Sequence, residues 1–211
     1  MSLSCSSYTI LKEKVSHQSM KPIKIYDNFI SDEELEEAYQ FINKEYTNTV
    51  LNWRFNSIDN CWKKLLYVAE KNMVNHISMS FPCTSVRNFV LKMKNRIEKC
   101  TKNEFKISRV YLNRQNCGED VPMHIDDGVN PNAYTFLIYM GDITPENFDK
   151  VGGILEFKNK ERTKIEPFTK RAVLFRSDIF HSPFGPLIPG VTRISLALKL
   201  IVNSPLVIRW T

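Results

Sequence analysis

The chain of 211 residues is 43% hydrophobic and 25% charged, a composition typical of a folded globular protein. This composition excludes a low-complexity or disordered protein, and the length predicts one domain with a sizeable core. The formal net charge of +6 at pH 7 is compatible with an acidic partner such as nucleic acid or an acidic peptide, but does not require one.

The first 20 residues are polar and irregular, and we expect a flexible arm followed by a single domain spanning residues 21–211. The arm lacks the apolar run of a signal peptide, and no later segment has the roughly 18 apolar residues of a membrane span. The five cysteines include no Cys-x-x-Cys pair, which argues against a disulfide framework and a zinc site. We therefore expect a cytoplasmic protein with reduced thiols and no membrane partner.

The first half of the domain predicts helices after one short strand at residues 23–26. Ser31 is the expected N-cap of the first helix, and Glu34 completes a capping box three residues later. Apolar residues at helical spacing predict a second helix over residues 60–72 and a third from residue 84 to about residue 100.

The second half of the domain has the periodicity of strands. Strands are predicted at residues 105–112, 134–140, 153–157, 171–175 and 192–200. The segment 134–140 is apolar throughout, so we expect it in the middle of a sheet. Helices followed by strands indicate an α+β protein, in which a helical part at about residues 30–101 buttresses a β-sandwich or barrel at about residues 104–211.

The last strand has two different faces. From residue 193 to residue 200 its even positions are branched aliphatic, whereas its odd positions are Arg193, Ser195, Ala197 and Lys199. Since alternate side chains of a strand project to opposite faces, one face is expected to pack against the helices. The other face would be small and polar and have room for a ligand, with Arg193 suited to bind a carboxylate.

A His-x-Asp motif in the second half suggests a metal site. On an extended strand, His124 and Asp126 would project from the same face and could bind one ion. A third ligand must come from elsewhere, and His181 lies shortly after a later predicted strand. Two histidines and one carboxylate form the facial triad of non-haem Fe(II) oxygenases, which leaves coordination positions open.

Together these residues resemble the Fe(II)- and 2-oxoglutarate-dependent dioxygenases, and within them the prolyl hydroxylase-like group, the prolyl 4-hydroxylases. The resemblance covers residues 108–200 closely and residues 23–43 more loosely. Besides the triad and Arg193, it rests on segments that occur in the same order, at residues 135–139, 152–155, 165–167, 173–175 and 177–178. It implies a double-stranded β-helix, a jelly-roll or cupin-like barrel, with helices packed on the larger sheet.

The resemblance also implies roles for individual residues. His124, Asp126 and His181 would be the iron ligands and the catalytic residues. Arg193 would bind the C5 carboxylate of 2-oxoglutarate, although it follows His181 at a longer spacing than is customary in the family.

Four further residues would form the cosubstrate pocket by the same resemblance. Tyr139 would bind the C5 carboxylate together with the arginine, and Tyr111, Leu137 and Leu155 would line the pocket. The alternative for both tyrosines is an ordinary core aromatic.

The activity implied by the resemblance is hydroxylation of a C–H bond, first of all in a prolyl residue of a peptide or protein. It would consume O2 and 2-oxoglutarate and release succinate and CO2, with ascorbate as a possible further cofactor. A carboxylate at Asp126 argues for hydroxylation over halogenation, which needs that ligand position vacant. The loops at residues 45–60 and 113–132 would hold the substrate.

Two other functions remain open. The same chemistry could act on a free amino acid, another small metabolite or a nucleic-acid base, and the basic net charge motivates the nucleic-acid version. A protein of another class, a cupin-like module that binds metal without turnover, would use the same ligands.

Overall fold

The computed structural model describes residues 23–44, 53–68, 81–128 and 130–203, so the arm predicted for residues 1–20 lies outside the described residues. The helices are α1 (Asp32–Ile42), α2 (Thr84–Thr101) and the short α3 (Phe148–Val151). The strands are β1 (Ile23–Tyr26), β2 (Arg54–Asn56), β3 (Cys61–Val68), β4 (Phe105–Gln115), β5 (Ala133–Tyr139), β6 (Leu155–Phe157), β7 (Lys164–Ile165), β8 (Ala172–Arg176), β9 (His181–Pro183) and β10 (Arg193–Val202). None of the helices in the described part of the chain has both the length and the apolar character needed to cross a membrane.

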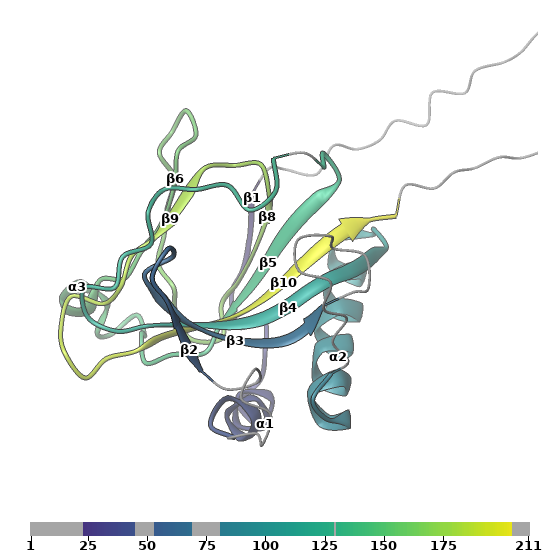
Figure 1. The fold of residues 1–211 in the computed structure, drawn as a ribbon, viewed down its shortest axis with the longest axis horizontal. Coiled ribbons are helices and arrows are strands. Elements are labelled where there is room, and N and C mark those ends of the chain that lie inside the picture. Colours follow the sequence, from purple (N-terminus) through teal and green to yellow (C-terminus); the bar gives the residue numbers. More distant parts are fainter. Residues whose placement is uncertain (1–22, 45–52, 69–80, 129, 204–211) are drawn as a thin grey trace, which may run out of the picture.

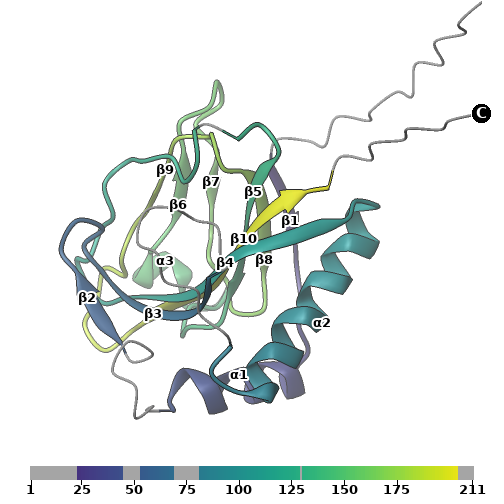
Figure 2. The same cartoon turned by 45° about the vertical axis from the view of Figure 1, so that its right-hand side comes forward.

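The strands form two antiparallel sheets. The larger has the order β1-β8-β5-β10-β4-β3-β2, and the smaller has the order β7-β6-β9. Helices α1 and α2 lie together on the outer side of the larger sheet, whereas the smaller sheet lies on its other side (Figures 1 and 2). The two-sheet, mainly antiparallel architecture predicted from the sequence is confirmed, as is the central position of β5. Closure of the sheets into a barrel stays a prediction.

The outer face of the larger sheet carries the main core. Leu196, Leu198 and Leu200 of β10 belong to the same buried cluster as the apolar faces of α1 and α2. Each such side chain contributes about 1.5–3 kcal/mol when fully buried. The odd positions of β10 face the other way, and Arg193 and Lys199 line a cavity between the sheets. The predicted division of this strand into an apolar and a polar face is therefore confirmed.

Helix α1 begins as the sequence predicts. The Glu34 backbone N–H donates to Ser31 Oγ, and the Ser31 backbone N–H donates to Glu34 Oε2, which completes the capping box. The Glu34 carboxylate also accepts hydrogen bonds of 2.8 and 2.6 Å from the Arg96 guanidinium of α2. These bonds from Arg96 are the main reason that the pKa of Glu34 lies at about 2, well below its ordinary value. The ion pair thus fastens the two helices to each other.

The helix predicted over residues 60–72 is wrong, because residues 61–68 form strand β3 at the edge region of the larger sheet, while residues 69–72 lie outside the described residues. The apolar residues of this segment have helical spacing, but the segment forms a strand because it pairs with β4. Lys64 is almost fully buried, and its ammonium donates to the carbonyl oxygens of Phe41 and Ile42, each at 3.1 Å. The Lys64 ammonium interacts favourably with the partial negative charge of the carbonyls at the C-terminal end of α1. The spacing of apolar residues in the sequence does not predict this contact.

Candidate metal centre and cosubstrate pocket

The His-x-Asp motif lies in the loop between β4 and β5 and is positioned by strand β9. His124 and His181 form an isolated antiparallel bridge, in which each backbone N–H donates to the other residue's carbonyl oxygen at 3.0 and 2.9 Å. Because partners in such a bridge project to the same side, the two imidazole rings lie 4.4 Å apart between centroids. The loop between β4 and β5 and strand β9 therefore meet at the site.

The expectation that His124 and Asp126 share a regular strand is wrong. Pro122 has no N–H to donate to a ladder, and the N–H groups of Asp126 and Asp127 both donate to the carbonyl oxygen of Ser177. Because these two hydrogen bonds go to one carbonyl oxygen, the strand pairing ends after a single bridge. The two ligand side chains still converge, because the bridge orients one and the bonds to Ser177 orient the other.

The predicted triad residues lie together. Ligand atoms of His124, Asp126 and His181 all lie within 4.8 Å of one another, so they could hold one metal ion. Each histidine donates its Nδ1–H to a backbone carbonyl, that of Pro122 at 2.8 Å and that of Ile179 at 2.9 Å. Since a carbonyl oxygen only accepts, the proton is on Nδ1 and the Nε2 lone pair of each ring points toward Asp126.

The protonation states of Asp126 and His181 suit metal binding, whereas the pKa of His124 is raised, because burial, which would lower it, is outweighed by the effect of the neighbouring Asp126 carboxylate. Burial alone would raise the pKa of Asp126, but the ammonium of Lys199 and the two imidazoles outweigh it and hold that pKa well below its ordinary value. Burial lowers the pKa of His181 to about 4. At neutral pH the carboxylate is therefore ionised and His181 is neutral, which are the forms that bind metals.

Two further residues contact the carboxylate of the triad. Thr135 Oγ1 donates to Asp126 Oδ2 at 2.6 Å, and Lys199 forms an ion pair with the same oxygen and donates to Thr135 Oγ1 at 2.9 Å. The sequence places Lys199 on the inward face of the last strand but does not predict its partner. Such a contact depends on how β5 and β10 pair, in which Thr135 is opposite Lys199.

Arg193 lies deeper in the same cavity and is only 3% exposed. Its guanidinium donates to Gln115 Oε1 and, at 3.3 Å, to the Tyr139 hydroxyl oxygen, while its buried Nε–H has no hydrogen-bond partner. Among the described residues, no carboxylate lies within ion-pair distance of Arg193. A buried arginine with an unused donor is an incomplete anion site, and a ligand carboxylate would complete it.

Gln115 is a residue that the sequence did not identify. Its Nε2 donates to the carbonyl oxygens of Glu119 and Pro183, at 2.7 and 3.0 Å, and these bonds orient its Oε1 toward Arg193. It faces Arg193 directly in the pairing of β4 with β10. Nothing in the sequence shows this register, so the role of Gln115 appears only in the fold.

The remaining predicted residues surround the same cavity, which has a volume of about 370 Å³. Tyr111, Leu137 and Leu155 line it, and Tyr139 lies behind it in contact with Arg193. These four side chains belong to one buried cluster between the sheets. The structure thus brings every residue predicted for the site into one place.

Comparison with solved structures shows which fold this is. A 2OG-Fe(II) oxygenase family protein from Burkholderia pseudomallei superposes with a TM-score of 0.62 at 14% identity, over 85% of this chain and 84% of that one. The chain has the fold of the 2-oxoglutarate–Fe(II) oxygenases. No model of a protein family matches the sequence, and no curated protein matches it either.

Two prolyl hydroxylases share this oxygenase fold. A prolyl 4-hydroxylase from Pseudomonas putida has a TM-score of 0.61 at 12% identity, over 88% of this chain and 95% of that one. A prolyl hydroxylase from Trichoplax adhaerens, solved with a peptide fragment of the hypoxia inducible factor oxygen degradation domain, has a TM-score of 0.57 at 16% identity, over 86% and 84% of the two chains.

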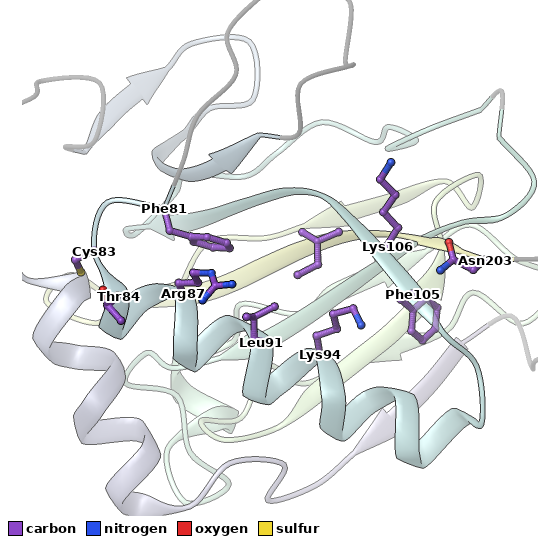
Figure 3. Close-up of a pocket in the computed structure, with 10 residues that line it drawn as sticks. Phe81, Cys83, Thr84, Arg87, Leu91, Lys94, Phe105, Lys106 and Asn203 are labelled. Atoms are coloured by element: carbon purple, nitrogen blue, oxygen red, sulfur yellow. The ribbon is translucent and has the colours of Figure 1, made fainter.

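A larger hollow of about 820 Å³ lies elsewhere on this oxygenase fold, between helix α2 and the start of β4 (Figure 3). Its lining contains lysine, arginine and apolar side chains but no histidine, aspartate or glutamate among the described residues: Phe81, Cys83, Thr84, Arg87, Leu91, Lys94, Phe105, Lys106, Ile107 and Asn203. It offers no set of histidine and carboxylate ligands for a metal ion, because Cys83 is its one ligand type among the described residues. The smaller cavity between the sheets is therefore the candidate active site.

Proposed function

We propose that the protein is an Fe(II)- and 2-oxoglutarate-dependent oxygenase that hydroxylates a prolyl residue in a peptide or protein. One observation carries the proposal: a single cavity has three convergent metal-ligand side chains at one end and a buried arginine with an unused donor at the other. A dicarboxylate that chelates the metal with one end needs such a cation for its other end.

The residues have distinct roles in this proposal. His124, Asp126 and His181 would hold the iron, and their hydrogen bonds to backbone and to Thr135 keep them oriented before it binds. Arg193, held by Gln115, would bind the C5 carboxylate of 2-oxoglutarate. When bound, the iron with 2-oxoglutarate and O2 supplies the oxidising power for hydroxylation, with release of succinate and CO2.

The apolar side chains that line the cavity have a role different from that of the polar ones. Leu137, Leu155 and Phe175 line the cavity and are buried, so they keep water away from the reacting groups. His181 packs edge to face on Phe175, with ring centroids 4.8 Å apart, which restricts rotation of its ring.

The choice of a prolyl substrate is supported by the solved prolyl hydroxylases that share the fold, one of which was solved with a peptide. Residues 21–211 form one catalytic domain in this proposal, with ascorbate as an accessory reductant. The location that we propose is the cytosol, supported by the free cysteines at positions 61, 83, 100 and 117.

The test is succinate formation by the Fe(II)-loaded protein with proline-containing peptides. We expect selected peptides to stimulate it and the Asp126→Ala variant to form none while keeping the wild-type circular dichroism spectrum. Asp149→Ala, at an exposed carboxylate of α3, is the matched control and should retain full activity.

Other outcomes would contradict parts of the proposal. Stimulation by free amino acids, metabolites or oligonucleotides, with none by peptides, would contradict the peptide substrate but not the chemistry. Iron binding without any consumption of 2-oxoglutarate would instead identify a non-catalytic cupin-like module. Full activity of Asp126→Ala would mean that the triad is wrongly assigned.

A further inference from the structure

The candidate active site contains more positive charge than its proposed ligands require. In the described chain the cavity is lined by the cations Lys63, Arg109, Arg193 and Lys199, but by only two carboxylates, Asp59 and Asp126. The charges of Fe(II) and of the 2-oxoglutarate dianion cancel. Even the loaded site would therefore keep an excess of positive charge, and this inference rests on the proposed function.

The register of the sheet places two of these cations side by side. Lys199 of β10 and Arg109 of β4 are direct cross-strand partners, and both line the cavity. Like charges directly opposite each other on one face of a sheet are destabilising. Asp126 offsets part of this repulsion in the free protein, and an anionic ligand beside Arg109 would offset the rest.

The ring of Tyr111 is the centre of the cationic group. The Lys63 ammonium, the Arg109 guanidinium and the Lys199 ammonium lie 5.5, 5.0 and 5.7 Å from its centroid. Three cations from three neighbouring strands therefore surround one aromatic ring, and all three line the same cavity. This group of cations reaches the candidate metal site, since Lys199 also contacts Asp126.

These three cations differ in what neutralises them. Lys63 is paired with Asp59, and Lys199 is paired with Asp126. Arg109 is exposed, and no described carboxylate lies within ion-pair distance of it. Asp126 would also share its charge with a bound metal, which leaves Arg109 and Lys199 as the cations available to another anion.

We propose that the substrate carries a carboxylate, and that Arg109, assisted by Lys199, binds it beside the reacting C–H bond. A guanidinium can bind a carboxylate through two parallel hydrogen bonds, which would fix the orientation of the substrate as well as its affinity. The carboxylate could belong to an Asp or Glu side chain next to the target residue of a peptide, or to a free acid.

The test uses two arms that separate these sources. In the first, peptides differing only by Asp or Asn next to the target proline are compared by succinate formation, and by fluorescence anisotropy on protein loaded with Mn(II) and 2-oxoglutarate. In the second, proline is compared with prolinamide. We expect the carboxylate-bearing member of at least one pair to have a kcat/KM about tenfold or more higher, as for hydrogen bonds to charged groups.

Variants at Arg109 make the test specific. Arg109→Gln should remove the preference for the carboxylate, and Arg109→Glu should reverse it in favour of a Lys-containing peptide. Arg87→Gln is the control: Arg87 is an exposed arginine of helix α2 that lines the other hollow. This variant should keep the wild-type preference for the carboxylate. Because Arg109 is exposed, its replacement leaves the core intact.

The results separate this inference from the proposed function. A carboxylate preference that depends on Arg109 among free acids alone supports the inference and contradicts the peptide substrate. Turnover of peptides or free acids with equal rates for each pair, unchanged in Arg109→Gln, overturns the inference and leaves the proposed function in place. No turnover and no binding in either arm overturns the inference as well.

Discussion

Gln115 gives the sharpest test of the cosubstrate pocket. It is 1% exposed, its Oε1 accepts a hydrogen bond from Arg193, and its Nε2 is held by two backbone carbonyls. Replacing it with glutamate keeps the shape of the side chain but places a negative charge beside the guanidinium. The new carboxylate would then pair with Arg193 and compete with the C5 carboxylate of 2-oxoglutarate.

The size of this competition follows from the geometry. Two unit charges about 4 Å apart attract each other by about 4 kcal/mol at an effective dielectric constant of about 20. The cost of burying the new charge offsets part of this, so the net penalty on 2-oxoglutarate binding is about 3 kcal/mol, or about a hundredfold in Kd. Gln115→Met removes the same acceptor and the same donors without adding a charge, and should weaken binding only about tenfold.

The assay is calorimetric titration of 2-oxoglutarate into Mn(II)-loaded protein, with KM for 2-oxoglutarate from succinate formation as the second measurement. Both variants lose the bonds from Nε2 to the carbonyls of Glu119 and Pro183, so their difference reports the effect of the carboxylate beside Arg193. Equal affinities of Gln115→Glu and Gln115→Met, or wild-type affinity in both, would refute the placing of the cosubstrate carboxylate at Arg193.

Two further predictions concern stability. The folded-state pKa of Glu34, about 2, lies below its unfolded value, so its ion pair stabilises the fold above about pH 4.5 and this stability is lost as the pH falls toward 2. Urea unfolding at pH 7 and pH 3 should show that Glu34→Gln costs about 2–3 kcal/mol at pH 7 and much less at pH 3; an equal cost at both would contradict the linkage. Leu198→Ala, at a fully buried position, should lower the free energy of unfolding by about 2–5 kcal/mol in the same assay, whereas a change below about 1 kcal/mol would mean that α1 and α2 do not pack on β10.

Local patterns in the sequence were sufficient for much of the fold. The capping box at Ser31, the apolar stripe of α2 and the two faces of β10 each depend on neighbouring residues, and the structure confirms all three. The strand β3 could not be predicted in this way. Its residues fit a helical spacing, and only the pairing with β4 and the burial of Lys64 against the end of α1 decide its structure.

The residues of the candidate site likewise fall into two groups, those that the sequence predicts and those that only the fold identifies. The triad and Arg193 stand out because their residue types and order have a known chemical use. Gln115 and Lys199 acquire their contacts from the register of β10 with its neighbours, and a single sequence does not show that register. The excess of positive charge around Tyr111 is likewise a property of three strands together.

The bridge between His124 and His181 joins the loop that follows β4 to strand β9, two segments that are far apart in the chain. An ion held by both imidazoles would close a covalent-like loop across that bridge, so the loop after β4 and the strand β9 would open only as one cooperative unit. Metal loading would then slow amide hydrogen exchange at both backbone N–H groups by the same factor. In this way the ion would stabilise the contact between the loop after β4 and strand β9, in addition to its role in the reaction.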